Sequence, residues 1–139
     1  MSNATMRTAD WTLPEDLTAG AFARRCVREF LSAPETPRAP QTDALVDSAE
    51  LVASELAVNA VRYGRPPATL ALRRLPDRLR LEVTNAPGSG EPALGTLDGD
   101  APGGRGLVIV SRATTDWGWQ RDDLGRITVW AEFSAEVSP

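Results

Sequence analysis

Glu55 and Asn59 are the residues whose types and spacing point most directly to chemistry. They are four residues apart, so a helix through residues 54–60 would present both on one face. A carboxylate can take a proton from a water or a hydroxyl, and an amide oxygen can ligate a hard cation such as Mg²⁺. The pair alone is not specific, because ordinary boundary residues of a helix have the same spacing.

A glycine cluster at residues 103–107 (Gly-Gly-Arg-Gly-Leu) is the second candidate segment. Glycines let a backbone approach a phosphate, free N–H groups at a helix start favour anions, and Arg105 adds a forked donor. The run does not match the dinucleotide fingerprint, because Ile109 stands at the third glycine position, and it is not a Walker A sequence. By itself it equally describes a turn with an N-cap.

The third candidate segment is 81–90, where a strand pattern ends at Asn85 and is followed by Gly88 and Gly90. Strand ends that run into flexible loops are common binding positions. Taken alone, the segment is equally a strand that simply leads into a loop.

The composition excludes several classes of protein. The net charge is −4 and the pI is near 4.8, which argues against direct binding of nucleic acid. The sequence has no His and no Lys, which excludes a Ser-His-Asp triad, a P-loop lysine and a Schiff-base lysine. The single cysteine, Cys26, can form neither an internal disulfide nor a zinc site, and we expect it to be a small buried hydrophobe.

The ends and the hydropathy of the chain predict its location. No apolar run reaches the roughly 18–20 residues of a membrane span, and the N-terminus lacks the shape of a signal peptide. We therefore expect no membrane association and a cytoplasmic location. Residues 1–5 resemble the remnant of an expression tag, which leaves 6–139 as a single predicted domain.

Periodicity predicts an α+β chain. The strands gather toward the C-terminal half, which favours a two-layer sandwich with three helices on one face of a mixed or antiparallel sheet of about five strands. Residues 86–104, rich in glycine and proline, are expected to form a mobile lid or binding loop. The expected helices are 15–31, 41–63 and 107–113, and the expected strands are 7–13, 68–75, 79–85, 116–120 and 127–133.

A helical wheel of residues 41–63 shows one apolar stripe, and Gly64 is the natural stop of this helix. Asn59 falls at the edge of the stripe, Glu55 lies about 40° further round, and Arg62 is next to them. A polar row beside a buried stripe is expected at the rim of a cleft. The stripe consists of Leu45, Ala49, Val52, Leu56, Ala60 and Tyr63.

Taken in order, these segments resemble the GHKL superfamily of ATPases, and most closely the small anti-sigma factor serine/threonine kinases of actinobacterial type. Residues 55–64 (Glu-Leu-Ala-Val-Asn-Ala-Val-Arg-Tyr-Gly) look like the N box of that superfamily, residues 103–107 like its second glycine box, and residues 127–130 like its final strand motif. The resemblance covers residues 11–133. It implies a Bergerat-type two-layer ATP-binding fold with a movable lid, and ATP and Mg²⁺ as cofactors.

The resemblance also implies a role for each matching residue. Glu55 matches the general base, and Asn59 matches the Mg²⁺ ligand that connects the ion to the phosphates. Thr128 matches a strand residue that helps to hold the adenine. The other nucleotide-binding positions are Arg62, Asn85, Gly88, Gly90, Gly104, Arg105, Gly106 and Leu107.

Asn85 departs from the family pattern, which normally has an Asp here to accept a hydrogen bond from the adenine amino group. Asn85 keeps an acceptor oxygen but loses the charge, which costs about 1–2 kcal/mol, or about tenfold in affinity. We therefore expect ATP to bind but weakly, with loss of binding as the alternative. Restored binding in Asn85→Asp would show that position 85 is the cause.

The leading functional hypothesis is a kinase that binds Mg-ATP, holds a sigma factor and phosphorylates a small antagonist protein. The alternative is a regulatory binding module that no longer turns over ATP. A sensor histidine kinase fragment fits poorly, because the chain has no His to accept phosphate. Family kinases are often dimers, and the four tryptophans, Trp11, Trp117, Trp119 and Trp130, either mark such a surface or pack into the core and the hairpin faces.

Overall fold

The structure is a computed structural model that describes residues 7–33, 43–89, 110 and 113–134. Its sheet has five strands in the order β1-β2-β3-β5-β4, and every neighbouring pair is antiparallel. The strands are β1 (Arg7–Thr12), β2 (Ala68–Leu75), β3 (Arg78–Asn85), β4 (Asp116–Arg121) and β5 (Ile127–Ser134), and the helices are α1 (Ala19–Ser32) and α2 (Asp43–Tyr63). The predicted α+β class and antiparallel sheet are confirmed.

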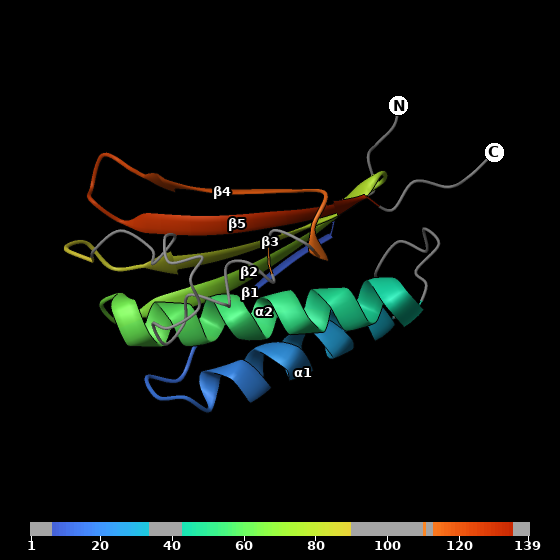
Figure 1. The fold of residues 1–139 in the computed structure, drawn as a ribbon, viewed down its shortest axis with the longest axis horizontal. Coiled ribbons are helices and arrows are strands. Elements are labelled where there is room, and N and C mark those ends of the chain that lie inside the picture. The colour runs from blue at the N-terminus through green and yellow to red at the C-terminus, as the bar shows by residue number, and fades with distance from the viewer. Residues whose placement is uncertain (1–6, 34–42, 90–109, 111–112, 135–139) are drawn as a thin grey trace, which may run out of the picture.

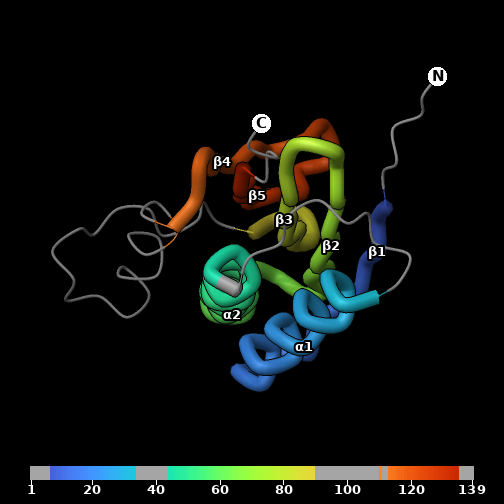
Figure 2. The backbone as a smooth tube through the Cα atoms, turned by 90° about the vertical axis from the view of Figure 1, so that its right-hand side faces the viewer, coloured from blue at the N-terminus to red at the C-terminus, as the bar shows by residue number. Residues whose placement is uncertain are grey.

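Both helices lie on the same face of the sheet, which gives the two layers seen in Figures 1 and 2. α2 packs against β2, β3 and β5, and α1 packs against α2 and β2. Among the described residues, no helix covers the other face of the sheet. Neither helix in this part of the chain is both long and apolar enough to cross a membrane.

The core forms because alternate strand residues face the helices. In β3, Leu79, Leu81 and Val83 are buried, and the residues between them are half-buried on the opposite face. β5 alternates in the same way and buries Ile127 and Phe133 at its two ends.

The apolar stripe of α2 packs onto this sheet as the wheel predicted. Ala49, Val52, Leu56 and Ala60 are buried. Tyr63 does not follow the prediction: it is 37% exposed, because it is the last residue of the helix and lies beyond the packed part of the stripe.

The predicted start of the first helix is wrong. We expected the helix from residue 15, but α1 begins at Ala19. The carboxylate of Asp16 accepts hydrogen bonds from both the backbone N–H and the hydroxyl of Thr18. Such a local turn, made by a side chain, competes with helix formation. The helix therefore begins only at Ala19, directly after Thr18.

The third predicted helix, 107–113, falls largely outside the described residues. Val110 and Ala113 are helical, and Val110 is fully buried. The described chain thus has two complete helices rather than three. Cys26 in α1 is buried, as expected for a small apolar side chain.

Candidate functional site

Glu55 and Asn59 are both half-buried side chains of α2. The residues that follow them in the chain, Leu56 and Ala60, are buried against the sheet. The helix therefore holds an acid and an amide at the boundary between the core and solvent. Four residues of helix separate the two by about 6 Å along the axis.

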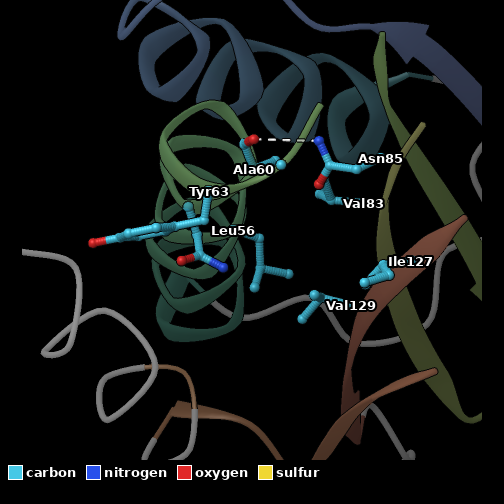
Figure 3. Close-up of a pocket in the computed structure, with 9 residues that line it drawn as sticks. Leu56, Ala60, Tyr63, Val83, Asn85, Ile127 and Val129 are labelled. Carbon is cyan, nitrogen blue, oxygen red and sulfur yellow. Dashed lines mark hydrogen bonds between the residues drawn. The ribbon is translucent and has the colours of Figure 1, made fainter. Parts of the chain in front are cut away.

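A hollow opens beside Asn59, between the C-terminal half of α2 and the region where β3 ends and β5 begins (Figure 3). The empty space among its lining residues is about 280 Å³ when the open solvent at its mouth is counted, and its enclosed part has room for about one water molecule. Apolar walls with a few fixed polar groups are typical of small-molecule sites. The lining residues are Leu56, Asn59, Ala60, Tyr63, Gly64, Val83, Asn85, Ile127 and Val129.

The side-chain oxygen of Asn59 is buried and accepts no hydrogen bond from the described residues. A buried polar atom without a partner costs about 1–3 kcal/mol, so this oxygen is available to a partner beyond the described residues. Amide oxygens are ligands that Mg²⁺ accepts, and the residue therefore fits a cation.

The described residues contain no cluster of three or more His, Cys, Asp or Glu side chains that could hold a metal ion without other ligands. A cation at Asn59 would take its remaining ligands from water and from phosphate oxygens. Mg²⁺ in nucleotide sites is usually held in this way, by one or two protein groups together with the substrate.

The Glu55 carboxylate makes no ion pair within the part of the chain that the structure describes. Glu50, five residues earlier in α2, differs: Arg28 holds it with two hydrogen bonds of 2.8 and 3.1 Å. The Glu55 carboxylate is thus without an ion-pair partner among the described residues. Glu55 does not line the hollow, but it lies one helical turn before Asn59, which does.

Asn85 ends β3 and lines the hollow, where it is buried. Its Nδ2 donates to the carbonyl oxygens of Ala60 and Arg65, both at 3.2 Å. These two bonds join the end of β3 to the C-terminal turn of α2 and to the segment that follows it. The resemblance placed Asn85 at a nucleotide-binding position; the structure places it in the hollow, and its contact with a nucleotide stays a prediction.

Further hydrogen bonds tie the segment after Asn85 to Arg65. The Ala86 N–H donates to the Arg65 carbonyl at 3.0 Å, and the Arg65 N–H donates to Ser89 Oγ at 2.8 Å. Gly88 has φ +90°, and a β-carbon there would lie 2.8 Å from Arg65 Nη1. Glycine at position 88 is therefore explained by this turn, and Gly88 is not among the residues that line the hollow.

Thr128 lies on the opposite face of the sheet from the hollow. Its hydroxyl is 2.8 Å from that of Thr84, the residue facing it on β3. The neighbours of Thr128 in β5, Ile127 and Val129, point toward the helices and line the hollow instead. The expected contact between Thr128 and an adenine ring does not fit this geometry, because successive strand residues alternate between faces.

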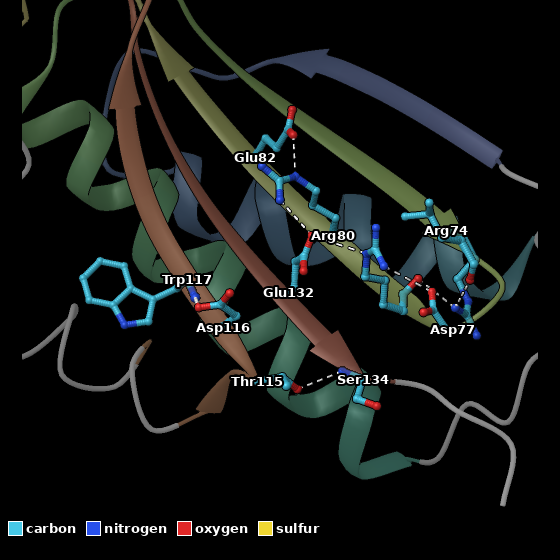
Figure 4. Close-up of polar contacts among 11 residues, drawn as sticks. Arg74, Asp77, Arg80, Glu82, Thr115, Asp116, Trp117, Glu132 and Ser134 are labelled. Atoms are coloured by element: carbon cyan, nitrogen blue, oxygen red, sulfur yellow. Dashed lines mark hydrogen bonds and ion pairs between the residues drawn. The ribbon is translucent and has the colours of Figure 1, made fainter.

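The face that carries Thr128 is polar and paired within itself (Figure 4). Arg80 binds Glu82 at 2.6 Å and Glu132 at 2.8 Å, and its guanidinium carbon lies 4.5 Å from the centre of the Trp130 ring. The hollow on the helical side is therefore the better candidate for a ligand site.

Several predicted site residues are not placed at the hollow. Arg62 is exposed and is absent from the lining of the hollow.

The four tryptophans are half-buried, and Trp11, Trp117 and Trp119 pack against the core. Gly90, Gly104, Arg105, Gly106 and Leu107 lie outside the described residues, so the meeting of the glycine cluster with the hollow stays a prediction.

Sequence reasoning missed the apolar walls of the hollow. Val83, Ile127 and Val129 belong to strand patterns that were correctly predicted, and the alternation of these strands was the available signal. That signal identifies the buried face of a strand. It does not say which buried residues remain uncovered at the end of a helix.

These features define an α+β domain with a candidate small-molecule site between a helix and its sheet. The family model of the histidine kinase-like ATPase domain matches residues 13–131. The chain therefore belongs to the histidine kinase-like ATPase domain family, in agreement with the GHKL resemblance, and this supports ATP binding and a regulatory role in general terms. A search of the curated proteins found no match.

Proposed function

We propose that the hollow beside α2 binds ATP with Mg²⁺, and that the chain transfers the γ-phosphoryl group to a serine or threonine of a small antagonist protein. A sigma factor is the second protein partner, as in the anti-sigma kinases that the sequence resembles. The observation that carries the proposal is the buried oxygen of Asn59, which lines the hollow and has no partner among the described residues, one helical turn from the Glu55 carboxylate in a chain of an ATP-binding family.

The residues of the hollow suit the parts of the nucleotide. Leu56, Ile127 and Val129 supply apolar surface for a base, and Asn85 supplies a polar group at its edge. Asn59 would hold Mg²⁺, which when bound offsets the charge of the phosphates and orients their oxygens.

Glu55 would act as the general base in the transfer. The hydroxyl oxygen of the antagonist forms a bond to the γ-phosphorus, the bond from that phosphorus to the β–γ bridging oxygen breaks, and ADP leaves with the electron pair. Glu55 takes the proton of the hydroxyl. Most of the rate enhancement in phosphoryl transfer comes from positioning and electrostatics, which the half-buried rim of α2 can provide.

Two measurements test this function. Calorimetry with ATP should show binding that is stronger with Mg²⁺ than with EDTA. Transfer of radiolabelled phosphate to candidate antagonists should fall by roughly 10²–10⁴-fold in Glu55→Gln, with ATP affinity nearly unchanged. Glu50→Gln is the matched control, because Glu50 lies on the same helix and is paired with Arg28. ATP binding without transfer in the wild type would reject the kinase activity.

The alternative is a protein-binding regulatory module without turnover, and the neutral Asn85 favours it. In this alternative the chain acts only by binding another protein. The absence of both binding heat and a thermal shift at millimolar ATP would favour the module over the kinase.

The association state belongs to the same proposal. We take the partners to be proteins in the cytoplasm rather than nucleic acid or a membrane, and the chain to form a homodimer. Light scattering in solution measures the mass of the particle and decides between a monomer and a dimer.

A further inference from the structure

A second pocket shares a wall with the hollow. Ala60, Gly64 and Asn85 line both spaces. The rest of the second pocket comes from the loop between β1 and α1 and from the segment that leads from α2 into β2, which lie at the same end of the molecule (Figure 1). We call this space the side pocket, and the residues that line it but not the hollow are Pro14, Glu15, Val61, Pro66 and Ala68.

The side pocket is roomier than the hollow. Its empty space is about 330 Å³ when the open solvent at its mouth is counted. The centre of a water molecule fits in about 80 Å³ of the side pocket, compared with about 10 Å³ of the hollow. The side pocket therefore has room for several water molecules, or for an aliphatic group of a few carbon atoms.

The inner walls of the side pocket offer little polar surface, although backbone lies among them. The Ala60 carbonyl already accepts hydrogen bonds from Gly64 N–H at 2.9 Å and from Asn85 Nδ2 at 3.2 Å. The Ala68 carbonyl accepts one from Leu13 N–H at 2.8 Å, and the two prolines of the lining have no N–H to donate. Because these polar groups are paired within the chain, the inner part of the pocket favours an apolar group.

Among the described residues, Glu15 is the one charged side chain in the lining, and it is exposed. Its carboxylate makes no ion pair with a described residue. The next carboxylate, that of Asp16, is already held by the turn before α1. An apolar interior with a free carboxylate at its mouth suits a short aliphatic stem that ends in a cation, because such a group buries its stem and keeps its charge in water.

The arginines near the side pocket do not favour an anionic ligand instead. Arg62 and Arg65 are next to lining residues in the chain, but neither belongs to the lining. Arg65 is directed toward the turn after β3, where a β-carbon at Gly88 would lie 2.8 Å from its Nη1. The net charge of −4 also favours the approach of a cation over that of an anion.

We propose that the side pocket binds an aliphatic ammonium group, whose carbon stem packs beside Val61 and the two proline rings and whose charge pairs with Glu15. The group comes from a free amine or from a lysine side chain of another protein. This chain has no lysine, so a second copy cannot supply it. The site is separate from the proposed ATP site and needs no nucleotide to be occupied.

The test is a titration of the isotope-labelled full chain with n-butylammonium chloride at pH 7, followed by NMR. We expect the backbone amide signals of Val61 and Ala68 to shift, with a dissociation constant of about 1–10 mM for a ligand of this size. Leu56 and Val129 line only the hollow, and their signals should stay unchanged. n-Butanol, which has the same stem without the charge, should bind about two- to fivefold more weakly.

Two variants test the charge and the space separately. Glu15→Gln should bind n-butylammonium about two- to fivefold more weakly and should no longer distinguish it from n-butanol. Glu29→Gln makes the same exchange at an exposed position of α1 outside the lining and should behave as the wild type. Val61→Met places a longer side chain in the pocket and should weaken the binding of n-butylammonium and n-butanol alike.

A blocked lysine, N-acetyl-lysine methylamide, distinguishes the two sources of the group. Tighter binding of the blocked lysine than of n-butylammonium assigns the pocket to a lysine side chain, and the reverse order assigns it to a free amine. The absence of shifts at Val61 and Ala68 up to about 100 mM n-butylammonium overturns the site. Equal binding of n-butylammonium by Glu15→Gln and the wild type overturns the pairing with Glu15. None of these measurements contains nucleotide, so their failure leaves the proposed ATP binding intact.

Discussion

Gly64 and Asn85 approach so closely that a β-carbon at position 64 would lie 2.2 Å from the Asn85 amide carbon. The backbone after α2 thus forms the surface on which the amide rests. Gly64 does not have a positive φ, unlike Gly88 and Gly125, so a left-handed helix cap does not explain its presence. Glycine is needed at position 64 for space, and the position of Asn85 in the hollow depends on it.

Gly64→Ala should therefore destabilise the protein by about 2 kcal/mol or more. Replacing glycine by alanine at an unstrained position next to a helix normally stabilises the folded protein by up to about 1 kcal/mol. A loss of stability in Gly64→Ala would therefore point to the steric contact with Asn85. Here the methyl group displaces the Asn85 amide and breaks hydrogen bonds worth about 1 kcal/mol each. Urea unfolding measures the change in the free energy of unfolding.

The double variant Gly64→Ala/Asn85→Ala provides the control for this contact. Removing the amide makes room for the methyl group, so the two single effects should not add. We expect a coupling of about 1 kcal/mol or more in the double-mutant cycle. Additive effects would show that the contact between these two residues is not the cause.

Most of the fold follows from periodicity in the sequence. β2 and β3 were predicted within one residue of their observed bounds, because Leu79, Leu81 and Val83 have to share a face. The start of α1 was missed because the turn made by Asp16 and Thr18 is a local competition between side chain and backbone. Proline and charge rules for helix starts do not register such a turn.

The candidate site was predicted less completely, because some of its residues come together only through the tertiary structure. Glu55, Asn59 and Asn85 carry chemistry in their residue types, so a search by type and spacing finds them. Ile127 and Val129 line the hollow because β5 pairs with β3 in one particular register, which no local pattern specifies.

Asn59→Ala should separate binding of the cation from stability. Because the buried Asn59 oxygen has no partner in the described chain and is costly in that state, Asn59→Ala should leave the free energy of unfolding without nucleotide unchanged or raise it. In the wild type, the thermal midpoint with ATP should rise further when Mg²⁺ replaces EDTA, since ligands stabilise the state that they bind. Asn59→Ala should lose this difference.

Ser48→Ala, another half-buried polar position of α2, is the control for Asn59→Ala and should keep the response to Mg²⁺. A full response to Mg²⁺ in Asn59→Ala would place the cation on other ligands.

Cys26 should be unreactive in the folded protein. Burial, and to a lesser extent the negative charge of Glu29, raises the pKa of its thiol from 9.0 to about 11. At pH 8 an aromatic disulfide reagent should therefore react only as the protein unfolds, because the thiolate is the nucleophile. The folded state holds the proton more tightly than the unfolded state, so the stability contributed by this group is present below about pH 9.0 and is lost as pH rises toward 11.

Cys26→Ala supplies the comparison for both effects. It should show no reaction at any denaturant concentration, because the chain has no other cysteine. It should also show a smaller loss of stability than the wild type between pH 9 and 11. Rapid labelling of the native wild type would contradict the buried position.

Asp122 organises the β4–β5 turn, and its titration should reveal this. Its carboxylate accepts hydrogen bonds from Arg126 Nε at 2.7 Å and from the backbone N–H groups of Leu124 and Arg126 at 2.9 Å. The side-chain bond from Arg126, which outweighs the other causes, lowers the pKa of Asp122 below its ordinary value of 3.8. A depressed pKa means that this group stabilises the turn above pH 3.8, the ordinary value, and that the contribution is lost as pH falls through the lower pKa of the folded state.

We expect carboxyl titration by NMR to show a low pKa of Asp122 in the wild type and in Arg121→Gln, and a return toward 3.8 in Arg126→Gln. An equal pKa in all three proteins would show that Arg126 does not hold the turn that leads into Ile127 and the hollow.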